Sequence, residues 1–291
     1  GFVSGPGGIA AWLAGRPLLI HEQNAVAGTT NRILAHFSQR VFQAFPDSFP
    51  ASIDAELIGN PVRSEILNLY DSNERLMPRS FADSSRTLRL LILGGSQGAR
   101  ALNLNVPEAL AILPQNMILD VWHQTGQGFE ETRDAYAKHH MEARLDVFLD
   151  DMEAAYAWAD LVICRAGALT ISELTVAGLG AILIPYPYAA DDHQLHNAEH
   201  FVSGGAGIII PENELTPDFL RSSRVYVYIQ ITYWLDLLTV LALRLSLMLP
   251  ETWQKHVFNL QRRSHERSDG RYPLHSFCWD WWRWYGWDCR G

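Results

Sequence analysis

Residues 161–173 read LVICRAGALTISE, and this stretch decides the fold. Its apolar start predicts a buried strand, its small residues predict a tight turn, and a helix then begins that carries Thr170, Ser172 and Glu173. Gly167 permits close backbone approach, and the free N–H groups of a first helical turn favour an anionic group. An acidic side chain one turn further can accept hydrogen bonds from sugar hydroxyls. The stretch therefore predicts a site for a nucleotide sugar.

The strand and helix alternation extends on both sides of this stretch. Apolar segments such as LRLLIL at residues 88–93 and AILIPYP at residues 181–187 alternate with helical segments. Near-continuous apolar strands joined by helices are typical of a parallel sheet covered on both faces. Upstream, PLLI at residues 17–20 and RVFQAF at residues 40–45 predict a smaller unit of the same kind. The predicted fold class is α/β, with two Rossmann-like parallel-sheet domains.

The chain of 291 residues, 48% of them hydrophobic, is long enough for two domains. We place an incomplete first domain at residues 1–63, a polar linker region at 64–87, and the larger sheet domain at 88–220. Residues 221–291 form a tail that does not continue the pattern.

Charge and cysteine content exclude several classes of protein. A net charge of −9 argues against a nucleic-acid binder, because a phosphate backbone is bound by a basic surface. Three scattered cysteines favour neither a disulfide framework nor a zinc site, and indicate a reducing cytoplasmic setting. The adjacent Asp150 and Asp151 lack a third metal ligand at sensible spacing and are better explained as helix caps. No metal site and no cofactor are predicted.

A second glycine-rich loop, GGSQGAR at residues 94–100, follows the strand at residues 88–93. Its glycines and the hydroxyl of Ser96 suit a phosphate cradle, although no Gly-Lys-Ser/Thr closes it as a P-loop. It also matches part of a dinucleotide fingerprint. That alternative, a dinucleotide-binding oxidoreductase, requires an acidic ribose contact about twenty residues further on, near Asp120.

Polar groups also follow the first predicted strand. The segment HEQN, His21 to Asn24, comes where α/β proteins place ligands, although a helix-capping Asn and a packed His explain it equally well. Arg63, in NPVR, could clamp a phosphate. Residues 1–12 predict a glycine-rich loop that runs into a helix. Because the chain opens on Gly1 inside this loop, we expect an upstream portion to be missing.

The tail has an unusual composition. Residues 225–249 form a long apolar run, and half of the ten tryptophans lie at positions 279–287. Reading one base later turns every tryptophan codon into a glycine codon, and this yields a glycine-rich pattern that resembles the start of a muramate-alanine ligase. We therefore expect residues 221–291 to be non-native, as the product of a frameshift near Leu220.

Several motifs in order resemble one family: VSGPGG, HEQN, GNPVR, LGGSQGAR, WHQTG, the run from Asp150 to Glu173, and the region around Gln194. They look very like the UDP-N-acetylglucosamine transferases that complete the lipid-linked peptidoglycan precursor lipid II. The resemblance covers about residues 1–220. It implies a GT-B fold, with the acceptor lipid on the first domain and the UDP-sugar on the second, and an inverting, metal-independent hexosyl transfer.

The resemblance also implies roles for single residues. Asn24 and Arg63 would contact the donor from the first domain and the hinge. Ser96 would face the diphosphate, Leu149 would pack at the uracil and Gln194 would hold the sugar. The residues that would wrap the nucleotide, with the last of them on the ribose hydroxyls, are Ala168, Leu169, Thr170, Ile171, Ser172 and Glu173.

The implied partners are UDP-N-acetylglucosamine, the lipid I acceptor and the cytoplasmic surface of the bacterial inner membrane, where the protein would be peripheral and serve cell-wall synthesis, cell shape and cell division. The family's first glycine loop, with its favoured catalytic histidine, is expected upstream of Gly1. The catalytic base is therefore unassigned, and His21 and Glu22 remain as candidates. We accordingly expect this chain to lack transferase activity. A fragment that only binds UDP-sugar is the third alternative.

Overall fold

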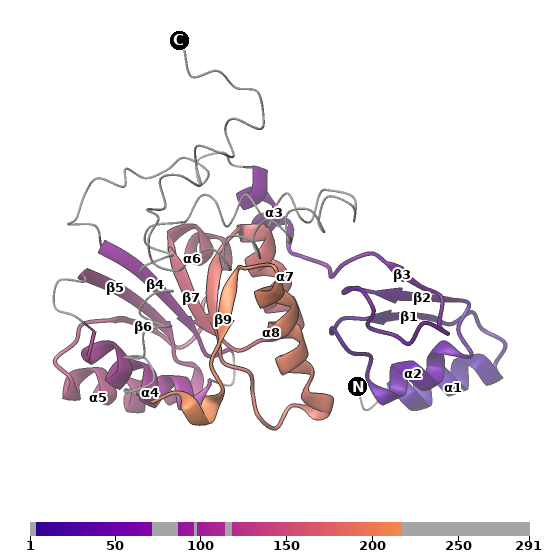
Figure 1. Ribbon diagram of the computed structural model, residues 1–291, viewed down its shortest axis with the longest axis horizontal. Helices are drawn as coiled ribbons and strands as arrows, with labels where there is room; N and C mark the ends of the chain where they lie inside the picture. Colours follow the sequence, from indigo (N-terminus) through magenta and orange to yellow (C-terminus); the bar gives the residue numbers. More distant parts are fainter. Residues whose placement is uncertain (1–3, 72–86, 96–97, 114–117, 217–291) are drawn as a thin grey trace, which may run out of the picture. The chain divides into compact units, whose positions relative to one another are not determined.

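The computed structural model describes residues 4–71, 87–95, 98–113 and 118–216 (Figure 1). The predicted tail and the greater part of the predicted linker region lie outside these ranges, as does Ser96. Within the described residues, the search for helices long and apolar enough to cross a bilayer found none.

The larger sheet has six parallel strands in the order β6-β5-β4-β7-β8-β9. Their bounds are β4 Thr87–Leu93, β5 Ile118–Gln124, β6 Arg144–Asp146, β7 Leu161–Cys164, β8 Gly180–Leu183 and β9 Gly207–Ile209. All five pairings are parallel, as the apolar runs predicted. The apolar residues that follow β6 do not extend the strand: Val147 and Phe148 lie beyond its end and are exposed.

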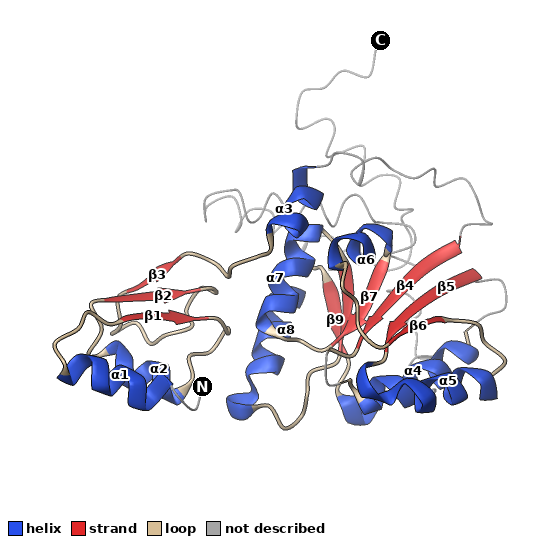
Figure 2. Cartoon of the chain, turned by 180° about the vertical axis from the view of Figure 1, so that it is seen from behind, coloured by secondary structure: helices blue, strands red, loops and turns tan. Residues whose placement is uncertain are grey.

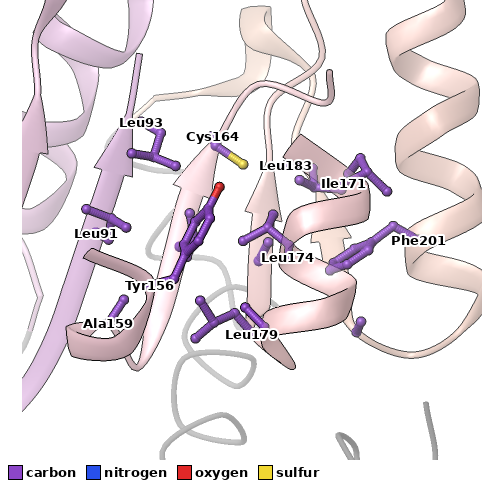
Figure 3. Close-up of a cluster of buried hydrophobic side chains, with 14 of the residues drawn as sticks. Leu91, Leu93, Tyr156, Ala159, Cys164, Ile171, Leu174, Leu179, Leu183 and Phe201 are labelled. Carbon is purple, nitrogen blue, oxygen red and sulfur yellow. The ribbon is translucent and has the colours of Figure 1, made fainter. Parts of the chain in front are cut away.

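Helices cover both faces of this sheet, which Figure 2 shows in blue against the red strands. On one face α4 (Arg100–Ala111) and α5 (Phe129–Lys138) enclose a core with Leu102, Val106 and Tyr136. On the other face lie α3 (Ser64–Asp71), α6 (Met152–Trp158), α7 (Ala168–Ala177) and α8 (His193–Ser203). Their core includes Tyr156 and Leu174 (Figure 3). Two buried faces explain why the strands carry apolar residues at nearly every position.

The order of the strands places a topological switch point between β4 and β7. From β4 the chain moves to β5 and β6 on one side, and from β7 to β8 and β9 on the other. The register pairs Leu93 with Cys164, so the glycine loop after β4 and the turn after β7 leave the sheet side by side. In open α/β sheets, ligands bind in the crevice at such a point.

The smaller sheet contains β1 (Leu19–Glu22), β2 (Arg40–Gln43) and β3 (Ala55–Leu57), all parallel. Helices α1 (Ser4–Leu13) and α2 (Thr29–Ala35) accompany it, and Leu34 and Val41 belong to its core. The predicted strand covered residues 17–20, whereas β1 begins and ends two residues later. His21 and Glu22 therefore belong to the strand.

The predicted loop at the start of the chain is wrong, because residues 4–8 already belong to helix α1. Gly8 is buried against α2, where an added Cβ would lie 2.7 Å from Cδ1 of Leu34. The glycine therefore serves the close approach of two helices, and that contact outweighs its low helix propensity.

The beginning of the predicted linker region is helical. Residues 64–71 form α3, and Ile66 and Leu69 are buried in the same core as α6 and α7. Three short 3₁₀ turns complete the described structure: η2 Gly126–Gly128, η3 Ala190–Asp192 and η4 Glu212–Glu214.

Candidate functional site

Helix α7 begins at the switch point with its first turn open for a ligand. Gly167 is its N-cap residue, and the first helical hydrogen bond runs from Ile171 N–H to the Gly167 carbonyl. The earlier N–H groups of an α-helix have no partner within the helix and favour an anion. The Arg165 guanidinium donates to the Ile184 carbonyl at 3.1 Å and pairs with Glu212, which holds the preceding turn in place.

Glu173 lies one turn further along α7 and is held from two sides. Its Oε1 accepts from Nε of Arg63 at 3.0 Å and forms an ion pair with Nη2 of the same guanidinium at 2.9 Å. Its Oε2 accepts from the hydroxyl of Tyr156 at 3.1 Å. The structure thus joins two residues predicted at separate places, Arg63 and Glu173, and adds Tyr156 of α6.

The six predicted nucleotide contacts of α7 are not equally accessible. Leu169 is 44% exposed, and Thr170 is partly exposed. Ala168 and Ile171 are buried in the core, so they can reach a ligand only through their backbone. Ser172 donates back to the Ala168 carbonyl and accepts from the side-chain amide of Asn60, which stabilises the first turns. This split follows from the helical period, which turns successive side chains to different faces.

The second glycine loop packs on the loop that follows β5. Gly94 N–H donates to the Gln124 carbonyl at 3.2 Å. Gly98 has a φ of +74°, and an added Cβ there would lie 2.6 Å from the Thr125 carbonyl oxygen. Both the backbone angle and the contact require glycine at this position. Ser96, the predicted diphosphate contact in this loop, lies outside the described residues.

A buried polar network supports that loop from below. His123 Nε2 lies 3.1 Å from Asn103 Oδ1, and its Nδ1 lies 3.1 Å from the Tyr136 hydroxyl. Because an amide oxygen only accepts, Nε2 carries the hydrogen and Nδ1 accepts from the tyrosine. Burial lowers the pKa of His123 to about 3. Asn103 in turn donates to the Thr125 carbonyl at 2.9 Å, so the network fixes the floor of the glycine loop.

Gln194 lies at the start of α8, beyond the end of β8. Its side-chain oxygen accepts from Tyr186 N–H at 2.9 Å. The amide NH₂ is the part of this side chain that can donate to a ligand. The neighbouring aromatic rings of Tyr186 and Tyr188 lie 5.6 Å apart, and Tyr188 is 81% exposed.

The HEQN segment is organised by the carboxylate of Glu22, which is 3% exposed. It accepts from Asn24 N–H, from the Asn24 amide, from Gly28 N–H and from the Asn31 amide, at 2.7 to 3.2 Å. His21 Nε2 donates to the Gly59 carbonyl at 3.0 Å, which leaves Nδ1 as an acceptor. Of the two candidate bases, Glu22 is thus tied to the loop by four donors.

Asn197 is fully buried in α8 and was not predicted. Its Oδ1 accepts from Ala25 N–H at 2.8 Å, and its Nδ2 lies 3.2 Å both from Asn24 Oδ1 and from the Ala166 carbonyl. A polar residue in the buried stripe of α8, next to Ala198 and Phe201, is the sequence signal that would have identified it. It links the HEQN segment to the turn before α7.

Three other predicted positions have clear structural outcomes. Asp151 Oδ1 accepts from Ala154 N–H at 2.8 Å, which confirms the helix-cap interpretation. Leu149, the predicted uracil contact, is 5% exposed and belongs to the core. Asp120 lies near the start of β5, four residues before its carboxyl end, which is the wrong end for a dinucleotide ribose contact. Among the described residues, no cluster of three or more His, Cys, Asp or Glu side chains could hold a metal ion.

Comparisons with known proteins agree with this architecture. The model of the glycosyltransferase family 28 C-terminal domain matches residues 89–224, and that of the family 28 N-terminal domain matches residues 1–43. The crystal structure of MurG from Acinetobacter baumannii is similar with a TM-score of 0.70 and 40% identity, over 84% of this chain and 67% of that one.

Two curated relatives carry the name UDP-N-acetylglucosamine–N-acetylmuramyl-(pentapeptide) pyrophosphoryl-undecaprenol N-acetylglucosamine transferase. The protein from Nitrosococcus oceani is 56% identical over 221 residues, which are 76% of this chain and 60% of the relative. The protein from Marinobacter nauticus is 51% identical over 224 residues, 77% of this chain and 60% of the relative. The chain thus spans about 60% of the length of these relatives. It belongs to glycosyltransferase family 28, with the GT-B fold, in the group of these N-acetylglucosamine transferases.

Proposed function

We propose that this chain carries the UDP-N-acetylglucosamine site of a transferase that passes the sugar to undecaprenyl-pyrophosphoryl-N-acetylmuramoyl-pentapeptide, lipid I, to form lipid II. The observation that carries the proposal is the meeting of the glycine loop and the α7 N-terminus at the switch point, with Glu173 one turn behind. The names of the relatives specify the sugar and the acceptor.

In this proposal the diphosphate binds at the loop of residues 94–99 and the first turn of α7. The first turn of α7 supplies backbone N–H groups, and the dipole of this ten-residue helix adds a partial positive charge. Ser96 adds a hydroxyl donor. Arg63 is half exposed and can approach the diphosphate while its neighbour Glu173 accepts a ribose hydroxyl.

The uracil lies in this proposal near the loop after β6, where Leu149 supports it from the core. The contact surface itself is provided by the exposed neighbours Val147 and Phe148. Leu169 and Thr170 cover the nucleoside from the start of α7. The free amide NH₂ of Gln194 donates to the hydroxyls of the sugar, and Asn24 contributes from the HEQN segment.

The proposed reaction is a single displacement. The C4 hydroxyl oxygen of the muramoyl sugar forms a bond to the anomeric carbon, the bond from that carbon to the phosphate oxygen breaks, and UDP leaves with the electron pair. A base takes the hydroxyl proton, and the N–H groups around the diphosphate stabilise the charge on the leaving group. Because the hydroxyl attacks the anomeric carbon on the face opposite to the departing UDP, the anomeric configuration inverts. We assign no residue to the base.

The acceptor side of the proposal places the protein at the cytoplasmic face of the bacterial inner membrane. Support comes from α1 and the end of α2: Ile9, Trp12 and Leu13 are 48 to 73% exposed, Ile33 is 54% exposed, and Phe37, two residues beyond α2, is 42% exposed. The rings of Trp12 and Phe37 lie 4.9 Å apart, so the two helices form one apolar surface. Such a surface suits the boundary of a bilayer that contains a lipid substrate.

Binding and turnover test the proposal separately. Calorimetric titration should give saturable binding of UDP-N-acetylglucosamine and none of NADH; the reverse would favour an oxidoreductase. An assay with UDP-N-acetylglucosamine and lipid I tests the transfer itself: we expect no lipid II from this chain, and clear turnover would refute the expectation that it lacks transferase activity. Sedimentation with anionic vesicles tests the membrane surface: Trp12→Gln should reduce the bound fraction and leave the titration with UDP-N-acetylglucosamine unchanged.

A further inference from the structure

A buried phenol lies directly behind the carboxylate that the proposed donor site uses. Tyr156 belongs to α6 and is 1% exposed. Its ring packs in the core between the sheet and α7, and its hydroxyl end points toward the end of β7 at Cys164 (Figure 3). That hydroxyl donates to Oε2 of Glu173 at 3.1 Å.

The two oxygens of Glu173 differ in the hydrogen bonds that they accept. Each carboxylate oxygen offers about two lone-pair sites. Oε1 accepts from Nε of Arg63 at 3.0 Å and forms an ion pair with Nη2 at 2.9 Å, so this oxygen faces the guanidinium. Oε2 accepts from the Tyr156 hydroxyl and can take a second hydrogen bond. Because the guanidinium occupies the Oε1 side, a ribose hydroxyl is expected at Oε2, the oxygen that Tyr156 orients.

Several features make Tyr156 a fixed donor. Burial, followed by the charge of Glu173, raises the pKa of Tyr156 well above its usual value, so the phenol stays protonated at neutral pH. Helix α6 is anchored by the Asp151 cap, and the ring is enclosed by core residues such as Leu174. A tyrosine side chain has only two rotatable bonds and loses little entropy when its position is fixed. In contrast, Arg63 is half exposed.

We propose that Tyr156 is a positioning residue of the nucleotide site, which sets Oε2 of Glu173 so that it selects ligands with ribose hydroxyls. This inference rests on the proposed function, since it takes Glu173 as the ribose contact. Tyr156 itself touches no ligand in this account. Its effect should therefore depend on the presence of the hydroxyls and on the charge of Glu173.

A ligand cycle on the whole chain tests this. UDP and 2′,3′-dideoxy-UDP are titrated calorimetrically into the unaltered protein and into Tyr156→Phe. The unaltered protein should prefer UDP by roughly tenfold or more, the range of a hydrogen bond to a charged group. Tyr156→Phe should reduce that preference by roughly threefold to tenfold and leave the affinity for dideoxy-UDP within about a factor of two. Partial unfolding of a variant lowers its apparent affinity for both ligands by the same factor. The ratio of the two affinities is therefore independent of folding.

Two further variants complete the design. In Glu173→Gln, adding Tyr156→Phe should change the preference no further, because the phenol acts through the carboxylate. Tyr136→Phe is the matched control: it removes the same hydroxyl from an equally buried tyrosine on the opposite face of the sheet. Because Tyr136 supports the glycine loop through His123 and not Glu173, this change should weaken UDP and dideoxy-UDP by the same factor and leave the preference unchanged.

The outcomes separate this inference from the proposed function. If the unaltered protein binds neither UDP nor dideoxy-UDP, the donor site itself is refuted. If it binds UDP with the expected preference and Tyr156→Phe keeps that preference, or weakens both ligands equally, the positioning role is overturned while the donor site stands.

Discussion

The side-chain oxygen of Gln194 accepts a hydrogen bond from the backbone N–H of Tyr186 at 2.9 Å. This contact fixes which end of the amide faces the protein. The NH₂ end is left to donate, and a pyranose ring offers hydroxyl oxygens that accept. A side chain that can both donate and accept thus presents its donor end to the sugar of the proposed ligand.

Replacing Gln194 by Glu should remove the sugar contribution to binding and spare the nucleotide. The carboxylate can still accept from Tyr186 N–H, but it has no hydrogen to donate. We expect the affinity for UDP-N-acetylglucosamine to fall about fivefold, as for the loss of one hydrogen bond of roughly 1 kcal/mol, while the affinity for UDP stays within about twofold. Paired calorimetric titrations measure both. An equal loss for the two ligands would contradict the assignment of Gln194 to the sugar.

Stability should depend on pH through His123. Its folded pKa of about 3 lies below the unfolded value of 6.5, so between these values the unfolded state binds a proton that the folded state does not. The free energy of unfolding should therefore fall as the pH falls from 6.5 toward 3, by up to about 1.4 kcal/mol per pH unit from this group. Urea unfolding at stepped pH measures the slope.

His123→Gln should reduce the dependence of the unfolding free energy on pH by up to the contribution of one bound proton. It should also lower the stability near neutral pH. His36→Gln, which replaces an exposed histidine, should keep the slope of the unaltered protein. Parallel slopes for all three proteins would show that His123 does not titrate as expected.

Alanine at Gly98 should destabilise the fold more than alanine at Gly95. Both glycines have positive φ, +74° and +76°, which costs an L-residue about 1–2 kcal/mol. At Gly95 the added methyl group meets open space, whereas at Gly98 it would lie 2.6 Å from the Thr125 carbonyl oxygen. Gly98→Ala should therefore lose additional stability and displace the loop that we propose binds the diphosphate. Denaturant titration and UDP binding of both variants decide this, and equal losses would count against the packing argument.

Glu22→Gln should act on the stability of the protein, because we expect the carboxylate of Glu22 to have a structural role and not that of a catalytic base. The NH₂ group of the new carboxamide must face one of two sets of donors. These are the donors of Asn24 in one orientation, and the donors of Gly28 and Asn31 in the other. A loss of about 1–3 kcal/mol in unfolding free energy follows for a buried group that loses its partners. Glu56→Gln serves as control, because its exposed pair with Arg40 contributes at most about 1 kcal/mol. If both changes have the same small effect, Glu22 does not organise the HEQN segment.

Sequence patterns predicted the architecture well where the signal is local and repeated. The apolar run of residues 88–93 lies within β4, and LVIC at residues 161–164 is β7. Asp151 was predicted as a helix cap and is one. These features depend on neighbouring residues along the chain, such as a run of branched side chains or a polar residue before a helix.

Prediction failed where the deciding contact is distant in sequence. The glycines of residues 5–8 look like a loop, but Gly8 is helical because Leu34 of another helix packs against it. Tyr156 has the pattern of a core residue and is one, yet its hydroxyl reaches Glu173, seventeen residues away.

By itself, the sequence of this protein determined most of the strands and helices of the larger sheet and the position of its small-residue loops. It also determined the family, because the motifs occur in a fixed order. Only the tertiary structure decided which partner each polar atom meets: Arg63 at Oε1 and Tyr156 at Oε2 of Glu173, and the Tyr186 N–H at the oxygen of Gln194. The physical reason is that a hydrogen bond consumes a particular lone pair or hydrogen, and the partner that consumes it is brought near only by folding.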